Sequence, residues 1–490
     1  MMMMMIRAAF GKISPILILI LSVIISDSNA SANGGVFHVQ HKFAGQQPSV
    51  RSLIDHDTHR HQRFLHSVNL PLNGTNDPTG YGLYFTKIKL GTPSKDYYVN
   101  IDTGTGLTWV GCASCNTCPK MSGIGVELTL YNTSNSSTSR NVSCNEDYCP
   151  EKNCLRGSSC TYDIMYDLDR IVSGYYVKDI IEYERVSGNL TTTPATSTVV
   201  FGCTMERSRL PSTIALDGVI GFDQSPYSII SQISAAGETK RKFSHCIRHS
   251  KGGGIFAIGD VTWPVVKTTP MVPKRDNYIV NLISIMVGEG TLDFPESVLS
   301  TKNMTETVVD SGISLAYLPE AMYQALLIKI FKNHGDLVLE SHGDIAGRKR
   351  GDNYICFGYK GRLEDFPNVT LIFDGSLQLV VTPQIYLYEL KKGDTYCLLW
   401  QISNQETLDG RGQASLGATV LSNQLVVYDL ENQVIGWSNY DCSENILVKD
   451  EESKQIFGVD GRKSSIAQSH REIGRSIILF FLSAIFTTIY

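Results

Sequence analysis

Charged residues are scarce in this chain. Lys and Arg (43) and Asp and Glu (48) together make up only 19% of the 490 residues, and the formal net charge at pH 7 is -5. So small an excess of negative charge gives no basis for binding nucleic acid or an anionic membrane surface. The chain also lacks a P-loop, a dinucleotide-binding glycine pattern and a zinc-type spacing of Cys and His. We therefore expect no cofactor, no metal and no nucleic-acid partner.

The chain is too long for one hydrophobic core, so at least two lobes are expected. Beyond residue 76, short apolar runs between turn residues predict strands, and helical spacing predicts short helices at residues 228–236 and 320–332. Pro264, Pro270 and Pro273 mark a boundary near residues 261–273. The strands are expected at residues 83–90, 97–101, 199–202, 255–259, 369–373 and 425–429.

The first 30 residues have the pattern of a secretory signal peptide. Arg7 and Lys12 supply positive charge, residues 13–25 are largely apolar, and Ser28-Asn29-Ala30 predicts cleavage after Ala30. A transmembrane anchor is the alternative reading, but the apolar run is too short for one.

The C-terminal residues predict a GPI-anchor signal. A polar spacer at residues 446–475 precedes a hydrophobic tail at residues 476–490, and Ser464 and Ser465 are small residues suited to anchor attachment. A tail-anchored helix is the alternative, although the 15-residue tail is short of the ~20 residues of a span. The expected location is the outer face of the plasma membrane, the cell wall or the extracellular space, with the membrane reached through the anchor.

The cysteines agree with export. All twelve lie between Cys112 and Cys442, and seven of them crowd residues 112–160. The spacing Cys112-x-x-Cys115-x-x-Cys118 also fits a metal or iron–sulfur site, but disulfides are favoured in an exported chain. Seven Asn-x-Ser/Thr motifs predict glycosylated surface positions. They are Asn73, Asn132, Asn135, Asn141, Asn189, Asn303 and Asn368.

Two similar segments carry the chemistry: Ile101–Thr105 and Val309–Ile313 each place an Asp before a hydroxyl residue and a Gly. Each is followed about a hundred residues later by a short apolar segment ending in Gly, at residues 219–221 and 415–417, which indicates an internal duplication. Two unrelated strand-end Asp-Gly turns are the alternative. Two carboxylates facing one water share a proton, so one activates the water and the other protonates a peptide carbonyl. The hydroxyls of Thr103 and Ser311 are of a type that can lock one loop against the other.

With these motifs the chain resembles the pepsin-like aspartic proteases, and especially the plant subgroup with a GPI-anchor signal. The resemblance implies an all-β, bilobal fold with a central active-site cleft and short peripheral helices. It also implies an acid-favoured endopeptidase, a monomer that acts on polypeptides. It rests on LYFTKIKLGTPSKDYYVNIDTG, TWVGCASC, FGC, ALDGVIGF, GGGIFAIGD, VVDSGISLAYLP and LSNQLVVYDLENQVIGWSNYDC.

The resemblance also assigns residues. Asp102 and Asp310 are implied to be catalytic, Tyr166 to be the flap tyrosine and Trp109 its support. It pairs Cys356 with Cys397 and implies that the crowded cysteines staple an insertion between Asp102 and the flap. The implied domains are a prosegment at 31–75, an N-terminal lobe at 76–262 and a C-terminal lobe at 263–445. The supporting residues of the catalytic loops are Thr103, Gly104, Thr105, Ser311 and Gly312.

Residues 31–75 show little strand pattern. The resemblance implies that their basic groups cover the acidic cleft, and a solvated N-terminal arm is the alternative. Six of the chain's eleven histidines lie here and change charge between about pH 5 and 8, so we expect them to set the pH of prosegment release. The histidines are His38, His41, His56, His59, His61 and His66, and the basic residues include Lys42, Arg51, Arg60 and Arg63.

The chain departs from the family at two places. Ile313 stands where a Thr or Ser usually donates a hydrogen bond to the second aspartate, and the flap Tyr166–Arg170 has lost both of its usual glycines. A pepsin-fold binding or inhibitor-decoy protein with weak or no proteolysis is therefore kept as the alternative function.

Overall fold

The computed structural model describes residues 35–41, 84–122, 127–150, 155–167, 170–188, 190–207, 215–248, 253–294, 304–342, 354–389, 394–407, 410–449 and 454–459. Within these residues the secondary structure is mostly strand, with few short helices, so the predicted all-β, bilobal fold is confirmed. In that part of the chain, no helix is long and apolar enough to cross a membrane. The predicted signal peptide and hydrophobic tail, Asn73, Asn189, Asn303, Ser464 and Ser465 lie outside the described residues.

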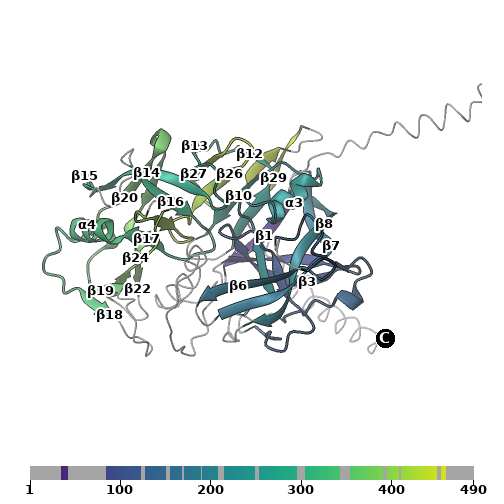
Figure 1. Ribbon diagram of the computed structural model, residues 1–490. Helices are drawn as coiled ribbons and strands as arrows, with labels where there is room; N and C mark the ends of the chain where they lie inside the picture. Colours follow the sequence, from purple (N-terminus) through teal and green to yellow (C-terminus); the bar gives the residue numbers. More distant parts are fainter. Residues whose placement is uncertain are drawn as a thin grey trace, which may run out of the picture.

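In Figure 1 most strands of the first half of the chain lie to the right and most of those of the second half to the left, while the last strands of the chain, in yellow-green, lie at the top between the two groups. Every predicted strand and both predicted helices are present, with boundaries shifted by a few residues. The elements of the first half are β1 (Gly35–His41), β2 (Tyr84–Leu90), β3 (Lys95–Asp102), β4 (Trp109–Gly111), η2 (Thr133–Asn135), β5 (Arg140–Asn141), β6 (Thr161–Asp167), β7 (Arg170–Gly188), β8 (Thr191–Arg207), β9 (Gly218–Gly221), α3 (Ile229–Ala235), β10 (Lys242–Ile247), β11 (Gly254–Ile258) and β12 (Asp260–Trp263).

The second half begins after the predicted proline-rich boundary. Twelve of its strands form an eight-stranded sheet and a four-stranded sheet, and the other five lie in sheets that also contain strands of the first half. Its elements are β13 (Lys267–Pro270), β14 (Ile279–Val287), β15 (Gly290–Thr291), β16 (Thr305–Val309), β17 (Ala316–Pro319), α4 (Glu320–Ile330), β18 (Glu340–His342), β19 (Tyr354–Gly358), η5 (Leu363–Asp365), β20 (Val369–Phe373), η6 (Asp374–Ser376), β21 (Gln378–Val381), α5 (Pro383–Tyr386), β22 (Leu387–Glu389), β23 (Thr395–Leu398), β24 (Trp400–Ser403), β25 (Ala414–Leu416), β26 (Gln424–Asp429), β27 (Val434–Asn439), β28 (Ile446–Lys449) and β29 (Ile456–Val459).

A run of strands from both halves joins the lobes. Its order is β13-β27-β26-β10-β11-β1, and the seam between the halves is the antiparallel pair β10–β26, where His245 lies opposite Val426. Backbone hydrogen bonds therefore cross from one half to the other, and the two lobes cannot separate without breaking a sheet.

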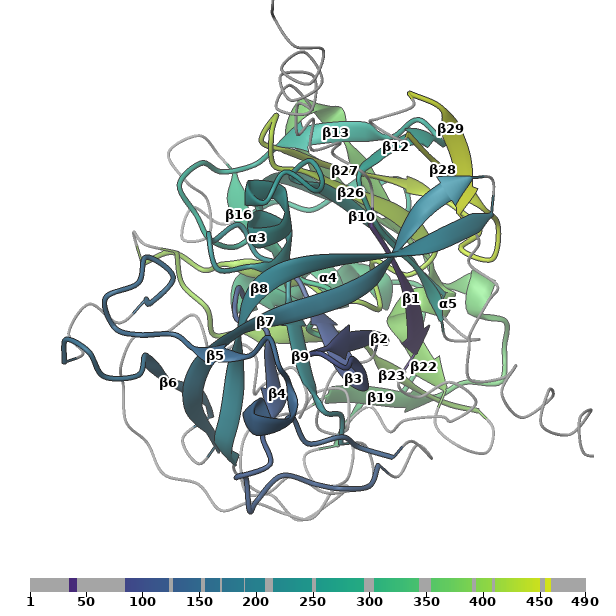
Figure 2. The ribbon, with the colours of Figure 1, turned by 90° about the vertical axis from the view of Figure 1, so that its right-hand side faces the viewer.

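β1 contradicts the expectation of little strand pattern in residues 31–75. It pairs antiparallel with β11, β2 and β7, so it is an interior strand of the sheet (Figure 2). The sequence reading missed it because one strand of alternating apolar and polar residues is a weak signal outside its sheet. The proposed covering of the cleft concerns residues beyond His41 that lie outside the described residues, and it stays a prediction.

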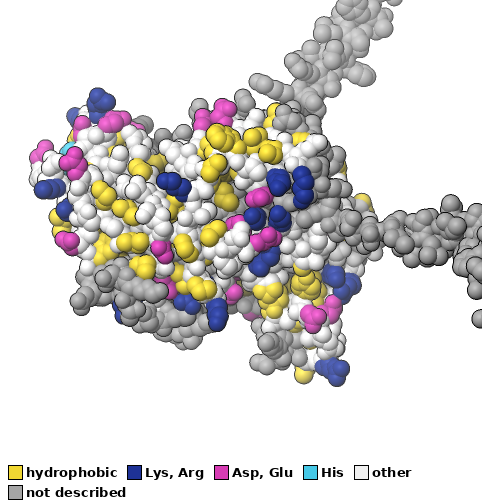
Figure 3. Space-filling model, turned by 90° about the horizontal axis from the view of Figure 1, so that it is seen from above, with side chains coloured by type: hydrophobic (Ala, Val, Ile, Leu, Met, Phe, Trp, Pro, Cys, Tyr) yellow, Lys and Arg dark blue, Asp and Glu magenta, His cyan; other side chains and the backbone are white. Residues whose placement is uncertain are grey.

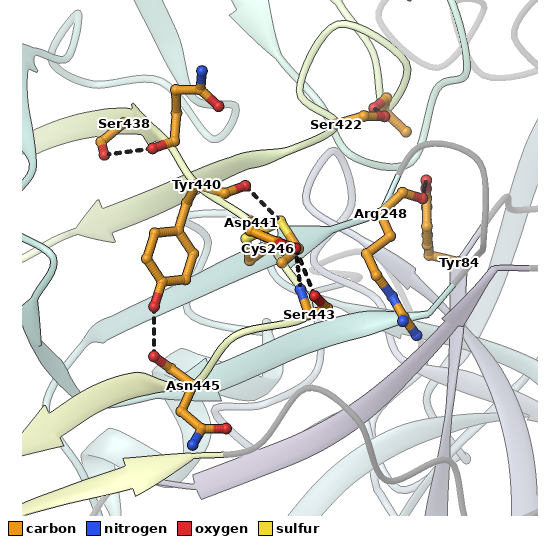
Figure 4. Close-up of a disulfide and its surroundings, with 12 residues drawn as sticks. Tyr84, Cys246, Arg248, Ser422, Ser438, Tyr440, Asp441, Ser443 and Asn445 are labelled. Atoms are coloured by element: carbon orange, nitrogen blue, oxygen red, sulfur yellow. Dashed lines mark hydrogen bonds between the residues drawn. A yellow bond between two sulfur atoms is a disulfide. The ribbon is translucent and has the colours of Figure 1, made fainter.

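The cysteines form disulfides, as predicted from the sequence. Cys115–Cys118 and Cys149–Cys160 lie within the insertion, Cys112–Cys203 ties its start to β8, and the predicted Cys356–Cys397 pair is present. Figure 4 shows Cys246–Cys442, which joins β10 of the first half to the residues after β27 across 196 positions of sequence.

The surface agrees with the modest charge of the chain. On the face shown in Figure 3, Lys and Arg side chains lie beside Asp and Glu side chains, among many uncharged groups. No large patch of one sign is visible on that face.

We expect the Cys246–Cys442 disulfide to stabilise the fold because it closes a loop of 196 residues, which strongly restricts the unfolded chain. Replacing both cysteines with Ala should lower the free energy of unfolding by about 2–5 kcal/mol, measured by denaturant unfolding. The matched control is Cys115→Ala/Cys118→Ala, which opens a separation of only 3 residues. Equal losses in the two variants would contradict the expectation.

Candidate active site

Each predicted aspartate stands at the end of a buried strand. Asp102 ends β3, and Asp310 follows β16. The short segments of the predicted duplication lie directly beside them, because β9 pairs parallel with β3 and β25 pairs parallel with β16. The two copies therefore build the same local arrangement, and the internal duplication read from the sequence is confirmed.

The two carboxylates are buried, and that of Asp310 lies against the loop of Asp102. Asp102 has an exposed fraction of 0% and Asp310 of 1%. The amide of Gly104 donates to Asp102 Oδ1 at 2.9 Å, and the amide of Gly312 donates to Asp310 Oδ1 at 2.7 Å. A Cβ atom at Gly104 would collide with the carboxylate of Asp310. Glycine at this position therefore lets the loop of one half touch the aspartate of the other.

The lock between the loops is one-sided. The amide of Ser311 donates to Thr103 Oγ1 at 2.9 Å, as expected for a hydroxyl that ties the loops together. Ser311 Oγ is buried and has no hydrogen-bond partner among the described residues. Thr103 therefore uses its side chain in this contact, whereas Ser311 contributes only its backbone, which corrects the expectation that both hydroxyls act alike.

Ile313 is part of the hydrophobic core. Its side chain is 1% exposed, and its carbonyl oxygen accepts a hydrogen bond from the amide of Ala418 at 2.8 Å. This bond fixes the backbone of the Asp310 loop at Ile313, while the side chain of Ile313 supplies packing and no donor.

The predicted flap is a hairpin. β6 and β7 pair antiparallel up to Asp167 and Arg170, and residues 168 and 169 lie outside the described residues. Tyr166 lies in β6 next to this turn, and its hydrogen bond to Trp109 stays a prediction. Trp109 itself is 1% exposed, and the guanidinium carbon of Arg207 lies 5.2 Å from the centre of its ring.

A third carboxylate near Asp102 was not predicted from the sequence. Asp223 is 7% exposed, its amide donates to Thr105 O at 3.1 Å, and its Oδ1 accepts from the amide of Ser225 at 2.8 Å. A Cβ atom on Gly106 would lie 2.6 Å from Asp223 Oδ1, so a side chain there would displace the carboxylate. Burial, with the charges of Asp276 and Asp102, raises the pKa of Asp223 to about 7. The only sequence signal was an Asp directly after a buried apolar run.

The remaining predicted sites are spread over the surface or fall outside the described residues. Asn135, Asn141 and Asn368 are exposed, and Asn132 is half-buried and accepts the amide of Ser134. Among the residues that the structure describes, no group of three or more His, Cys, Asp or Glu side chains is placed to hold a metal ion.

Comparison with known proteins agrees with this geometry. Family models described as "Xylanase inhibitor N-terminal" and "Xylanase inhibitor C-terminal" match residues 84–260 and 277–439. Aspartic proteinase 36 of Arabidopsis thaliana is 44% identical over 422 residues, which covers 85% of this chain and 86% of that protein. Aspartic proteinase 39 of the same plant is 40% identical over 428 residues, with 86% and 87% covered.

Solved structures show the same fold at low sequence identity. Basic 7S globulin from soybean superposes with a TM-score of 0.57 and 18% identity, covering 83% of this chain and 96% of that one. Conglutin gamma, a basic 7S globulin from lupine seeds, has a TM-score of 0.58 and 17% identity, with 84% and 96% covered. On the strength of the paired aspartate loops, the two family models and the Arabidopsis relatives, this chain belongs to the pepsin-like aspartic protease family.

Proposed function

We propose that the protein is an acid-favoured aspartic endopeptidase that hydrolyses peptide bonds in polypeptides. The observation that carries this proposal is the contact of Gly104 with the carboxylate of Asp310, which brings the buried aspartates of both halves together. Two carboxylates that face one water share one proton. One of them then takes a proton from the attacking water, while the other protonates the oxygen of the peptide carbonyl.

The chain's own residues prepare this step. The amides of Gly104 and Gly312 each donate to Oδ1 of their own aspartate and so fix the orientation of both carboxylates. Thr103 fixes the two loops relative to each other. Trp109 lies in β4, which pairs with β8 and β9. Its fixed position supports the proposed flap role of Tyr166.

Asp223 supports the preference for acid. As a neutral acid its carboxyl group is tolerated in the interior, whereas the ionised form is penalised by burial and by Asp102 and Asp276. The fold should therefore be more stable at acidic pH, where the shared proton of Asp102 and Asp310 is also retained.

The proposal extends to where the protein works. The patterns at residues 1–30 and 476–490 support export and a GPI anchor at Ser464 or Ser465, with the protein on the outer face of the plasma membrane or in the cell wall. Exposed Asn135, Asn141 and Asn368 support glycosylation at those positions. We expect a monomer without cofactor.

A pepsin-fold binding or inhibitor protein with little turnover is the second candidate. Two observations favour it: Ile313 supplies no donor to the second aspartate, and the matching family models bear the name of a xylanase inhibitor. The two candidates differ in one measurement, which is turnover of a denatured protein.

The first prediction for this function is that each aspartate is indispensable. Asp102→Asn or Asp310→Asn should abolish cleavage of a denatured protein at pH 3 to 6, because the pair acts as one unit. Activity is measured on the acid-treated secreted form with and without pepstatin, and correct folding of the variants is checked by circular dichroism. A variant that retains more than about a tenth of the parent activity would refute the assignment, and a parent without pepstatin-sensitive turnover would favour the binding protein.

The second prediction concerns Ile313. Ile313→Thr restores a hydroxyl beside the second aspartate, and a donor favours an ionised carboxylate, so the acid limb of the pH–rate profile should move to lower pH. Ile313→Val is the matched control, because it shortens the side chain without adding a donor. If both variants keep the parent's profile, the missing hydroxyl does not matter.

The third prediction concerns Asp223 and stability. A buried Asp whose pKa is raised to about 7 when folded stabilises the protein fully only below its unfolded pKa, and this contribution is lost as pH rises towards 7. The melting temperature of Asp223→Asn, which keeps the shape without the charge, should therefore fall less between pH 4 and 8 than that of the parent. The control is Asp293→Asn, because Asp293 is exposed and is not among the charges that raise the pKa of Asp223. Parallel curves for Asp223→Asn and the parent would show that Asp223 does not ionise in this range.

A further inference from the structure

A chain of hydrogen bonds runs beneath the contact between the two aspartate loops. Thr103 Oγ1 accepts the amide of Ser311 and, on its other side, interacts with the hydroxyl of Tyr428. The hydroxyl of Tyr428 lies 3.1 Å from Nε2 of His245. The residues come from four places: the first loop, the second loop, β26 and β10. The proposed mechanism does not use either Tyr428 or His245.

The chain is enclosed in an aromatic cluster. Tyr428 is 0% exposed and stacks on Phe243 with ring centres 4.4 Å apart. His245 is 1% exposed, and burial lowers its pKa to about 3, so it stays neutral in the range where the aspartates work. Its Nδ1 has no hydrogen-bond partner among the described residues. Buried polar groups in such surroundings are costly unless they are paired, so each bond in the chain matters to the next one.

The backbone amide of Ser311 can only donate, so it gives its hydrogen to Thr103. The hydroxyls of Thr103 and Tyr428 can each donate one hydrogen and also accept. Burial lowers the pKa of His245 and keeps its ring neutral, and the Nε2 of a neutral ring pairs with the hydroxyl of Tyr428 as donor or as acceptor, according to its tautomer.

We infer that Tyr428 and His245 are positioning residues that act through Thr103 to hold the loop of Asp310 against the loop of Asp102. This inference rests on the proposed function for its effect on rate. Neither residue touches substrate, so their loss should lower kcat and leave KM nearly unchanged. Without the hydroxyl of Tyr428, the side chain of Thr103 can rotate. The amide of Ser311 then loses an acceptor of fixed orientation.

The main test compares two buried tyrosines of the same cluster. Tyr428→Phe removes the hydroxyl that joins Thr103 to His245. Tyr278→Phe removes an equally buried hydroxyl, which donates to Phe222 O at 2.6 Å and takes no part in the chain. We expect kcat to fall about fivefold in the first variant, the effect of one hydrogen bond, and to change little in the second. Equal falls, or no fall in either variant, would overturn the inference.

A second pair of variants tests the histidine. The side-chain amide of His245→Gln can keep a hydrogen-bonding partner for Tyr428 near the position of Nε2, whereas His245→Leu removes it. The glutamine variant should retain a larger share of the parent's kcat than the leucine variant. If leucine is tolerated as well as glutamine, the hydrogen bond between Tyr428 and residue 245 has no role.

One readout does not need turnover. Hydrogen exchange at the amide of Ser311, followed by mass spectrometry or NMR, reports the bond to Thr103 directly. It should quicken in Tyr428→Phe and stay as in the parent in Tyr278→Phe. A protein without pepstatin-sensitive turnover would refute the proposed endopeptidase and still decide this inference, because unchanged exchange in Tyr428→Phe would overturn it.

Discussion

The amide of Ser311 donates a hydrogen bond to the hydroxyl of Thr103 at 2.9 Å, although 208 residues separate them along the chain. This bond joins the loop that carries Asp102, from the first half, to the loop that carries Asp310, from the second half. Burying two carboxylates together is costly, since each loses its hydration and repels the other. The loops can keep the two carboxylates buried, despite this free-energy cost, only if the surrounding structure prevents other loop conformations.

The strands and the aromatic cluster around the two loops restrict the loop conformations. Parallel pairing with β9 and β25 fixes the two strands that deliver the aspartates, and the shared sheet through β10 and β26 fixes one half against the other. The aromatic cluster of Phe243, Tyr278 and Tyr428 fills the space below. The arrangement of the two aspartates is therefore a property of the interface between the halves, and neither half contains it alone.

Much of this could be read from the sequence because the signals were local. Asp102 and Asp310 stood in repeated motifs with their glycines, and the strand boundaries followed apolar runs, as at residues 369–373, which the structure reproduces as β20. The pairing of Cys356 with Cys397 followed from the family resemblance, since sequence alone does not fix connectivity.

What the sequence did not reveal depends on contacts between distant residues. Asp223 and Gly106 are 117 positions apart, and neither is informative until the fold shows that one occupies the space left by the other. Tyr428 and His245 read as ordinary strand residues, because the bond between them exists only across the seam of two halves. The sequence also does not show that Thr103 uses its hydroxyl in the contact between the loops and Ser311 does not. Both residues carry a hydroxyl, and only the fold decides which of the two finds a hydrogen-bond partner among the described residues.

The seam at β10 and β26 also bears on synthesis. During translation the first half is complete by residue 263, yet the edge of β10 has no partner until residues 424–429 have been made. An unpaired strand edge is a site where chains associate wrongly. For the time needed to make more than 150 further residues, the nascent protein carries an open β-edge, and a cell that makes it must shield that edge until the last strands arrive.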